Sequence, residues 1–168
     1  MDTLKFKSIY LGQCIIKYQV PLDIFSAINQ IYEQNFHNLA PANGQLVGKI
    51  EKEHSLFYNG QDQSKMKNHN VLPKNVIDYF MTVFKHYLTF NKIRDYDTHL
   101  NSIWVNEMKE HEYNPAHIHR GMLFTGLSSV MILKLPSTYG KEYSAEHIQQ
   151  NGRLQILGAS NGQFAKID

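Results

Sequence analysis

The chain is poor in several features that mark particular classes of protein. It has a single cysteine, Cys14, among 168 residues, so no internal disulfide can form and a cysteine-rich zinc module is excluded. A reducing, intracellular setting is therefore expected. The 17 Lys and Arg residues are nearly balanced by 15 Asp and Glu residues and form no dense run, which argues against nucleic acid as a partner.

Long apolar runs are also missing. No stretch approaches the roughly 20 apolar residues of a membrane helix, and charged residues interrupt the first 20 positions, unlike in a signal peptide. We accordingly expect no membrane partner and a cytoplasmic location. Apolar residues still make up 42% of the chain, which suffices for a folded core and excludes a long disordered protein.

The first half of the chain predicts strands and helices. Residues 4–20 are rich in Ile, Tyr, Phe and Val, which predicts one or two strands. Proline can begin a helix because its missing N–H is not needed there. Apolar residues at helical spacing follow two prolines, so we expect helices over about 21–35 and 73–90. The polar segment 39–66 predicts a loop with short strand pieces at about 48–53.

The second half predicts mainly strands, with a turn at Asn114-Pro115. The expected strands cover residues 100–108, 128–135 (ended by Pro136), 153–157 and a segment from 164 onward. Helices before strands favour an α+β fold whose second half is antiparallel. We expect residues 1–95 to form a helical and strand lead-in and residues 96–168 to form the β part of one compact unit.

Two of the nine histidines differ from the rest. His117 and His119 lie two positions apart on a short segment expected to be extended. Alternate side chains of a strand share one face, with Cα atoms about 6.7 Å apart, so both imidazoles can reach one metal. Imidazole suits Fe, Zn, Cu and Ni alike, and spacing alone does not choose among them. Two exposed histidines on an edge strand remain the alternative.

The remaining ionisable residues of interest have simpler expected roles. Ordinary surface or structural roles are expected for His37, His54, His69, His86, His99 and His147. A solvated face or a turn is expected for the carboxylates nearest the histidine pair, which are Glu107, Glu110 and Glu112.

The histidine pair sits within an ordered series of motifs. The segment 104–109, Trp-Val-Asn-Glu-Met-Lys, leads through Asn114-Pro115 to His-Ile-His-Arg-Gly at 117–121, and an apolar segment ending at Pro136 follows. This order resembles the 2-oxoglutarate/Fe(II) oxygenases encoded by cyanophages and their relatives. The specific part of the resemblance covers roughly residues 100–136.

The resemblance implies a fold, a cofactor and three site residues. The fold would be α+β, with N-terminal helices packed on an antiparallel double-stranded β-helix, or jelly roll. Fe(II) would be the cofactor and 2-oxoglutarate the cosubstrate of a dioxygenase that hydroxylates an unknown substrate. His117 would be the first metal ligand, and His119 would replace the usual carboxylate. Asn106 would hydrogen-bond 2-oxoglutarate, although a strand-end or turn role is an equal alternative, and Trp104 is expected to pack in the core.

The chain departs from this family at its C-terminal end. Relatives continue with a strand that carries a distal His, followed by an Arg that binds the far carboxylate of 2-oxoglutarate. Neither lies here, and none of the arginines, Arg94, Arg120 and Arg153, occupies the position of that clamp. The jelly roll is therefore expected to be truncated, which leaves open whether this chain alone is an enzyme. A fragment, a natural truncation, an inactive homologue, and a homo-oligomer or second chain that completes the fold are the alternatives.

Two other functions stay open. One is a non-catalytic phage structural or interaction protein on a β-sandwich, in which the two histidines are incidental. The other is a cupin-like protein that binds Fe(II) or Zn(II) without 2-oxoglutarate. If the chain is phage-encoded, the expected cytoplasm is that of the infected host cell.

Overall fold

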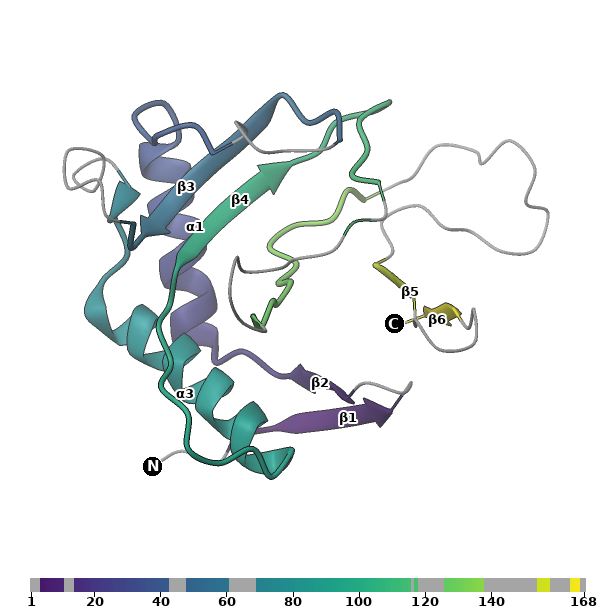
Figure 1. The fold of residues 1–168 in the computed structure, drawn as a ribbon. Helices are drawn as coiled ribbons and strands as arrows, with labels where there is room; N and C mark the ends of the chain where they lie inside the picture. The colour runs from purple at the N-terminus through teal and green to yellow at the C-terminus, as the bar shows by residue number, and fades with distance from the viewer. Residues whose placement is uncertain are drawn as a thin grey trace. The chain divides into compact units, whose positions relative to one another are not determined.

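The structure is a computed structural model that forms an α+β fold (Figure 1). It describes residues 4–10, 14–42, 48–60, 69–115, 117, 126–137, 154–157 and 164–166. Within them lie two helices and three two-stranded antiparallel sheets. The chain divides into two compact units, one made of residues 1–19 with 129–168 and the other of residues 20–128. The expected boundary at residue 95 stays a prediction.

The first unit contains two β-hairpin-like pairs. Strand β1 (Phe6–Tyr10) pairs with β2 (Cys14–Tyr18), and β5 (Gln155–Leu157) pairs with β6 (Phe164–Lys166). Strands predicted in these regions are thus confirmed. The strand predicted over 128–135 is wrong, because the described segment 126–137 lies outside any helix or strand. An apolar run becomes a strand only where another backbone edge pairs with it.

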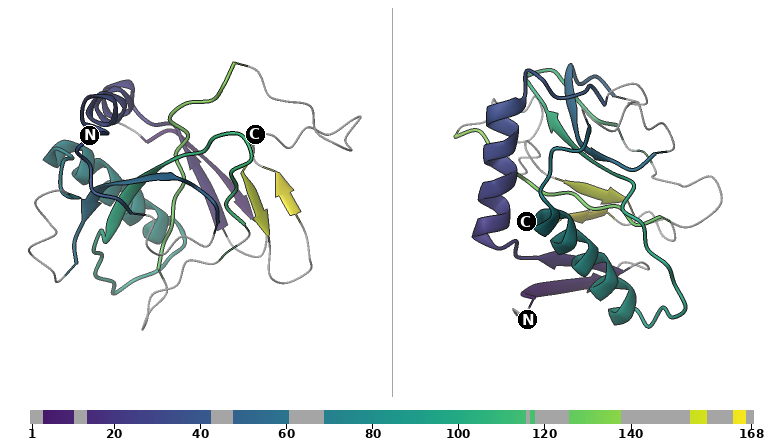
Figure 2. Two further views of the ribbon diagram at one scale, coloured as in Figure 1. Left: turned by 90° about the horizontal axis from the view of Figure 1, so that it is seen from above. Right: turned by 90° about the vertical axis from the view of Figure 1, so that its left-hand side faces the viewer.

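The second unit contains both helices. Helix α1 (Leu22–Asn35) begins after Pro21, and α3 (Lys74–Phe90) begins after Pro73. Both predicted helices are therefore confirmed to within one residue. Figure 2 shows α1 running alongside the ribbon formed by β3 (Lys52–Tyr58) and β4 (Ser102–Glu107). Among the described residues, neither helix is long and apolar enough to cross a membrane.

The end of α3 is fixed by a backbone motif. The N–H of Ile93 donates to Leu88 O (3.0 Å) and that of Lys92 donates to Thr89 O (3.0 Å). This pair of bonds is the Schellman pattern, in which the residue after the cap adopts a left-handed conformation. Lys92 occupies that position with φ 57°, where glycine would be less strained.

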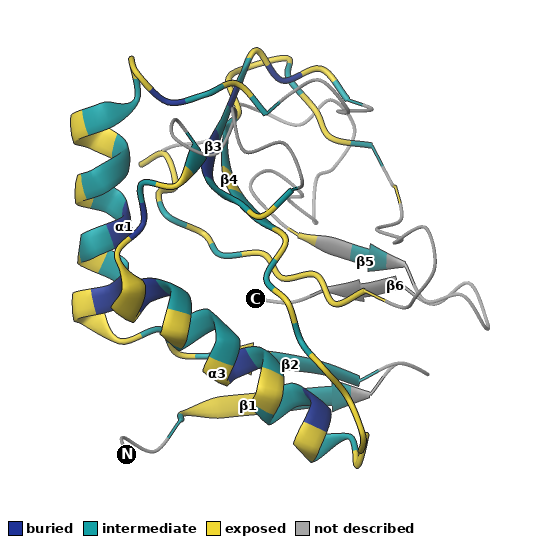
Figure 3. Cartoon of the chain, turned by 60° about the vertical axis from the view of Figure 1, so that its left-hand side comes forward, coloured by how far each residue is buried: buried dark blue, intermediate teal, exposed yellow. Residues whose placement is uncertain are grey.

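The core of the second unit is formed by residues of both helices, of β3 and of the segments beside them. Apolar side chains on α1 and α3 repeat at helical spacing and bury one face of each helix (Figure 3). The buried apolar residues are Ile24, Ile28, Leu39, Ile50, Leu56, Leu72, Val76, Val83 and Leu88. Two of them, Leu56 of β3 and Val76 of α3, are completely buried.

The β3–β4 ribbon is the framework of the candidate site. Strand β3 (Lys52–Tyr58) pairs antiparallel with β4 (Ser102–Glu107), with an irregularity between Ser55 and Phe57. The strand predicted at 100–108 is confirmed, whereas the strand pieces predicted at 48–53 were placed too early. The other edge of β3 is covered by residues 40–42, which form backbone hydrogen bonds of 2.8 Å with Glu53 and Ser55.

Candidate functional site

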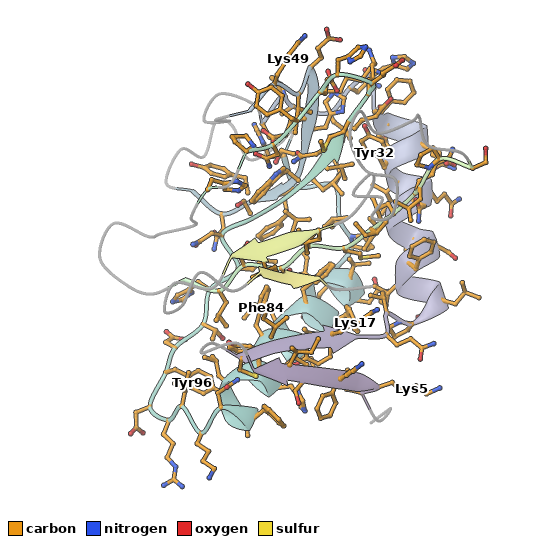
Figure 4. The ribbon with its side chains drawn as sticks, turned by 90° about the vertical axis from the view of Figure 1, so that its right-hand side faces the viewer. Lys5, Lys17, Tyr32, Lys49, Phe84 and Tyr96 are labelled. Atoms are coloured by element: carbon orange, nitrogen blue, oxygen red, sulfur yellow. The ribbon has the colours of Figure 1, made fainter. Side chains whose placement is uncertain are left out.

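One face of the ribbon carries a polar cluster that includes Tyr32 of α1, labelled in Figure 4. The Tyr32 hydroxyl lies 3.2 Å from Glu107 Oε2 and 3.3 Å from His54 Nδ1. It has one proton, which it donates to the carboxylate, so His54 Nδ1–H donates to the hydroxyl oxygen. Lys52 adds an ion pair of 3.3 Å to Glu107. These contacts tie α1 to both strands of the ribbon.

The cluster changes the protonation of its own members. Burial, the negative charge of Glu107 and the hydrogen bond to it raise the pKa of Tyr32 to about 12. Burial lowers the pKa of His54, against the raising effect of Glu107. Tyr32 is therefore a neutral donor and His54 a neutral imidazole near pH 7. This arrangement makes the cluster a structural connection, in keeping with the ordinary role expected for His54.

The opposite face carries a buried carboxyl group. Side chains alternate along a strand, so Glu53 and Ser55 point away from the face of Lys52 and His54. They are only 5% and 4% exposed. Glu53 lies opposite Asn106 in β4. Burial raises the pKa of Glu53, while hydrogen bonds from the Trp104 and Asn106 side chains lower it.

These bonds determine the orientation of the Asn106 amide. An ionised carboxylate can only accept, so the Asn106 Nδ2 group faces Glu53. Among the described residues, Asn106 Oδ1 then has no hydrogen-bond partner, although it is buried. An unsatisfied buried acceptor costs about 1–3 kcal/mol, so this position favours a hydrogen-bond donor. Turning the amide around requires a proton on Glu53, because two acceptors would otherwise face each other.

His117 lies eleven positions after Asn106 and is exposed. Its Nδ1 is 2.7 Å from the carbonyl oxygen of Pro115. A carbonyl can only accept, so Nδ1 carries the proton, and the lone pair of the neutral ring is on Nε2. Metal-binding histidines are commonly oriented in this way by a backbone carbonyl. His117 therefore fits the role of a metal ligand.

The other predicted site residues are placed differently. Asn106 lies in β4 on the face turned away from Tyr32, and His119 lies outside the described residues. Within the described part of the chain, no group of three His, Cys, Asp or Glu side chains could hold a metal ion. Of the two predicted histidine ligands, His117 alone lies within the described residues. His147 also lies outside the described residues.

Sequence reasoning missed Glu53 and misjudged Trp104. The Trp104 side chain was expected in the core, but it is 39% exposed and hydrogen-bonds Glu53. Its indole N–H gives it a polar partner that a purely apolar ring would not need. Residues 52–55 alternate between two faces of a strand, and this alternation was the signal in the sequence for Glu53. Only the pairing of β3 with β4 places Glu53 opposite Asn106.

Comparisons with known proteins identify no relative, since no family model, curated protein or solved structure matches the chain significantly. The residues that bear on function are therefore those of the motif, together with Glu53, which lies opposite Asn106.

Proposed function

We propose that this protein is a 2-oxoglutarate- and Fe(II)-dependent dioxygenase that hydroxylates a substrate. The main support is the orientation of His117, the first histidine of the His-x-His motif. Its Nδ1 lies 2.7 Å from the carbonyl oxygen of Pro115. The proton on Nδ1 leaves the lone pair of the neutral ring on Nε2, and the neutral ring is the form that binds divalent iron.

The placement of Asn106 gives further support. In the proposed double-stranded β-helix, helices cover the outer face of a sheet and the ligands lie against its inner face. Tyr32 of α1 contacts one face of the ribbon, whereas Asn106 and Glu53 lie on the other. Asn106 is therefore on the side where this fold would hold its cosubstrate.

The roles of individual residues follow from this proposal. His117 and His119 would hold the iron, which with 2-oxoglutarate and O2 supplies the oxidising power for hydroxylation. Asn106 would contact the cosubstrate, and Glu53 would control which end of the Asn106 amide is presented. The polar groups of 2-oxoglutarate are acceptors at neutral pH, so Asn106 can bind them only through Nδ2.

The test is an anaerobic titration with Co(II), a spectroscopic substitute for Fe(II). We expect the wild-type chain to bind Co(II) and the His117→Ala/His119→Ala double variant to lose that binding. His111→Ala is the matched control, because His111 is an exposed histidine of the same connection. Fe(II)-dependent formation of succinate from 2-oxoglutarate should likewise be seen with the wild type and the control and be lost in the double variant. Equal Co(II) binding by the wild type, the double variant and the control would refute the proposal.

A second candidate function is a non-catalytic interaction protein. It is favoured by apolar side chains exposed in residues 126–137, where Val130 is 62%, Ile132 50% and Leu135 52% exposed. Such a row can mark a protein–protein contact. If this function is correct, Ile132→Lys should alter self-association in sedimentation velocity, whereas the double histidine variant should not. Loss of Co(II) binding without any change in association would favour the oxygenase.

A further inference from the structure

The connection between β4 and His117 is held by the carboxylate of Glu112. Its Oε2 accepts the backbone N–H of Lys109 (2.7 Å), and its Oε1 accepts that of Glu51 (2.9 Å). Glu51 is 61 positions earlier in the chain. One side chain thus bridges the turn after β4 and the segment that leads into β3.

The bridged turn is tight. The Glu112 N–H donates to Lys109 O (3.1 Å), so these two residues bond reciprocally. Between them, His111 has φ 65°, a left-handed conformation that is uncommon for residues other than glycine. Lys109 Nζ also pairs with Glu51 Oε2 at 3.2 Å. The Glu112 carboxylate therefore stabilises a turn whose backbone conformation at His111 is unfavourable.

The residues after the turn are fixed to the same segment. Tyr113 N donates to Lys49 O (3.1 Å), and Lys49 N donates to Tyr113 O (2.9 Å). Lys49 is labelled in Figure 4. Beside this bridge, a Cβ at Gly48 would lie 2.8 Å from Pro115 Cδ, so the two backbones are in close contact. Pro115 then supplies the carbonyl that holds His117 Nδ1.

The charge state of Glu112 suits this role. Its hydrogen bonds to the backbone amides of Lys109 and Glu51 lower its pKa, so the carboxyl group stays ionised at neutral pH. Both oxygens can then act as acceptors. Bonds from backbone N–H groups to a carboxylate are stronger than neutral ones, whereas the exposed ion pair of Lys109 adds little.

We propose that Glu112 is a positioning residue that sets the ring orientation of His117 by fixing the path from β4 to Pro115. The inference rests on the proposed function for the metal-binding role of His117. Glu112 itself contacts no metal, cosubstrate or substrate in this role. It acts through the turn, the Tyr113–Lys49 bridge and the Pro115 carbonyl.

The test compares Glu112→Gln with Glu110→Gln. Glutamine is nearly isosteric, but its amide nitrogen cannot accept an N–H, so one of the two backbone bonds is lost. Glu110 is an exposed glutamate of the same turn whose described partner is His111, 3.6 Å away. Both variants lose one negative charge, so a difference between them reports the backbone bonds and not the net charge.

Two measurements are made on each full-length variant. In Co(II) titrations, Glu112→Gln should lose about tenfold or more in affinity, the effect typical of removing a residue that orients a ligand. Glu110→Gln should stay within about twofold of the wild type by the same comparison. In ¹⁵N NMR of the neutral imidazole of His117, the Nδ1–H tautomer should dominate in the wild type and in Glu110→Gln, and it should weaken in Glu112→Gln.

The two measurements separate the inference from the proposed function. If wild type and His117→Ala bind Co(II) equally, the oxygenase proposal fails, and the His117 tautomer alone then decides whether Glu112 positions the ring. If Glu112→Gln keeps the wild-type tautomer, the inference is overturned whatever the metal binding. If the tautomer weakens in Glu112→Gln but not in Glu110→Gln, the positioning role is supported.

Discussion

Replacement of Gly48 by alanine should destabilise the second unit through a backbone collision. A Cβ at this position would lie 2.8 Å from Pro115 Cδ and 2.9 Å from Asn114 Cα, and it would overlap the carbonyl oxygen of Tyr113. Ordinary contact begins at 3.4 Å. The obstacles are mainly backbone atoms, so no side-chain rotation removes them, and residues 113–115 must move away from residue 48.

The expected cost can be built up from these contacts. Displacement breaks the two hydrogen bonds between Lys49 and Tyr113, of 2.9 and 3.1 Å, each worth about 0.5–1.5 kcal/mol. The remaining collision adds about 1–3 kcal/mol of overpacking. The lower entropy of alanine in the unfolded chain offsets roughly 0.4–1 kcal/mol. The net loss in the free energy of unfolding is therefore about 1–6 kcal/mol.

Urea unfolding followed by fluorescence measures this loss directly. Trp104 is the only tryptophan in the chain, and it lies in β4 of the same unit. Gly60→Ala is the matched control, because the nearest atoms to its added Cβ belong to the ring of Tyr58, a side chain that can turn. The control should lose less than about 1 kcal/mol. Equal losses for the two variants would refute the reasoning about the close approach of residue 48 to residues 113–115.

Two further predictions concern α1 and α3. Tyr32→Phe removes the hydroxyl between Glu107 and His54 and should cost about 1–2 kcal/mol in urea unfolding. In the wild type, stability should fall between pH 10 and pH 12, because the folded pKa of Tyr32 is raised to about 12 and the neutral phenol is the bonded form. Absorbance titration should show that this late ionisation is absent from Tyr32→Phe. Lys92→Gly should raise the unfolding free energy by about 1 kcal/mol, because Lys92 is left-handed, and an unchanged urea midpoint would contradict this.

The helices were predictable because their signals are local. A proline begins each helix, and apolar residues recur at helical spacing behind it. The end of α3 is less evident, since Lys92 and not glycine occupies the left-handed position. The periodicity of the apolar residues was enough to predict the helix without a glycine at its C-terminal end.

Strands were harder to predict because pairing is not local. Glu53 and Ser55 are buried within β3, and polar residues at buried positions obscured the usual alternation, so this segment was assigned mainly to a loop. The reverse error arose at residues 128–135, where a clear apolar run is not part of a strand. Strand formation depends on a neighbouring edge that the run itself does not specify.

The site was only partly predictable for the same reason. The motif identified Asn106, His117 and His119 as candidates, whereas Glu112 was assigned to a solvated face or turn. Glu112 does lie in a turn, but its bond to the Glu51 amide spans 61 positions. No spacing rule detects such a pair, because the contact exists only after β3 and β4 have paired.

Glu53 leads to the most demanding prediction for the proposed enzyme. When it is ionised, the Glu53 carboxylate holds Asn106 Nδ2, while 2-oxoglutarate needs that same donor. If Asn106 binds the cosubstrate, binding must favour a proton on Glu53, whose pKa is already raised by burial. Affinity for 2-oxoglutarate should then fall as pH rises through the folded pKa of Glu53.

The Glu53→Gln variant isolates this coupling. Its amide can accept from Trp104 and donate to Asn106 Oδ1, which imitates the protonated carboxyl group and turns Asn106 Nδ2 toward the ligand. Calorimetry in two buffers with different ionisation enthalpies should show proton uptake on 2-oxoglutarate binding by the wild type, and no uptake with tighter binding by Glu53→Gln. Glu51→Gln, an exposed change nearby, should behave like the wild type. Binding by the wild type without proton uptake would mean that Asn106 does not donate to the cosubstrate, so its buried acceptor would instead suit an N–H or O–H group of the substrate.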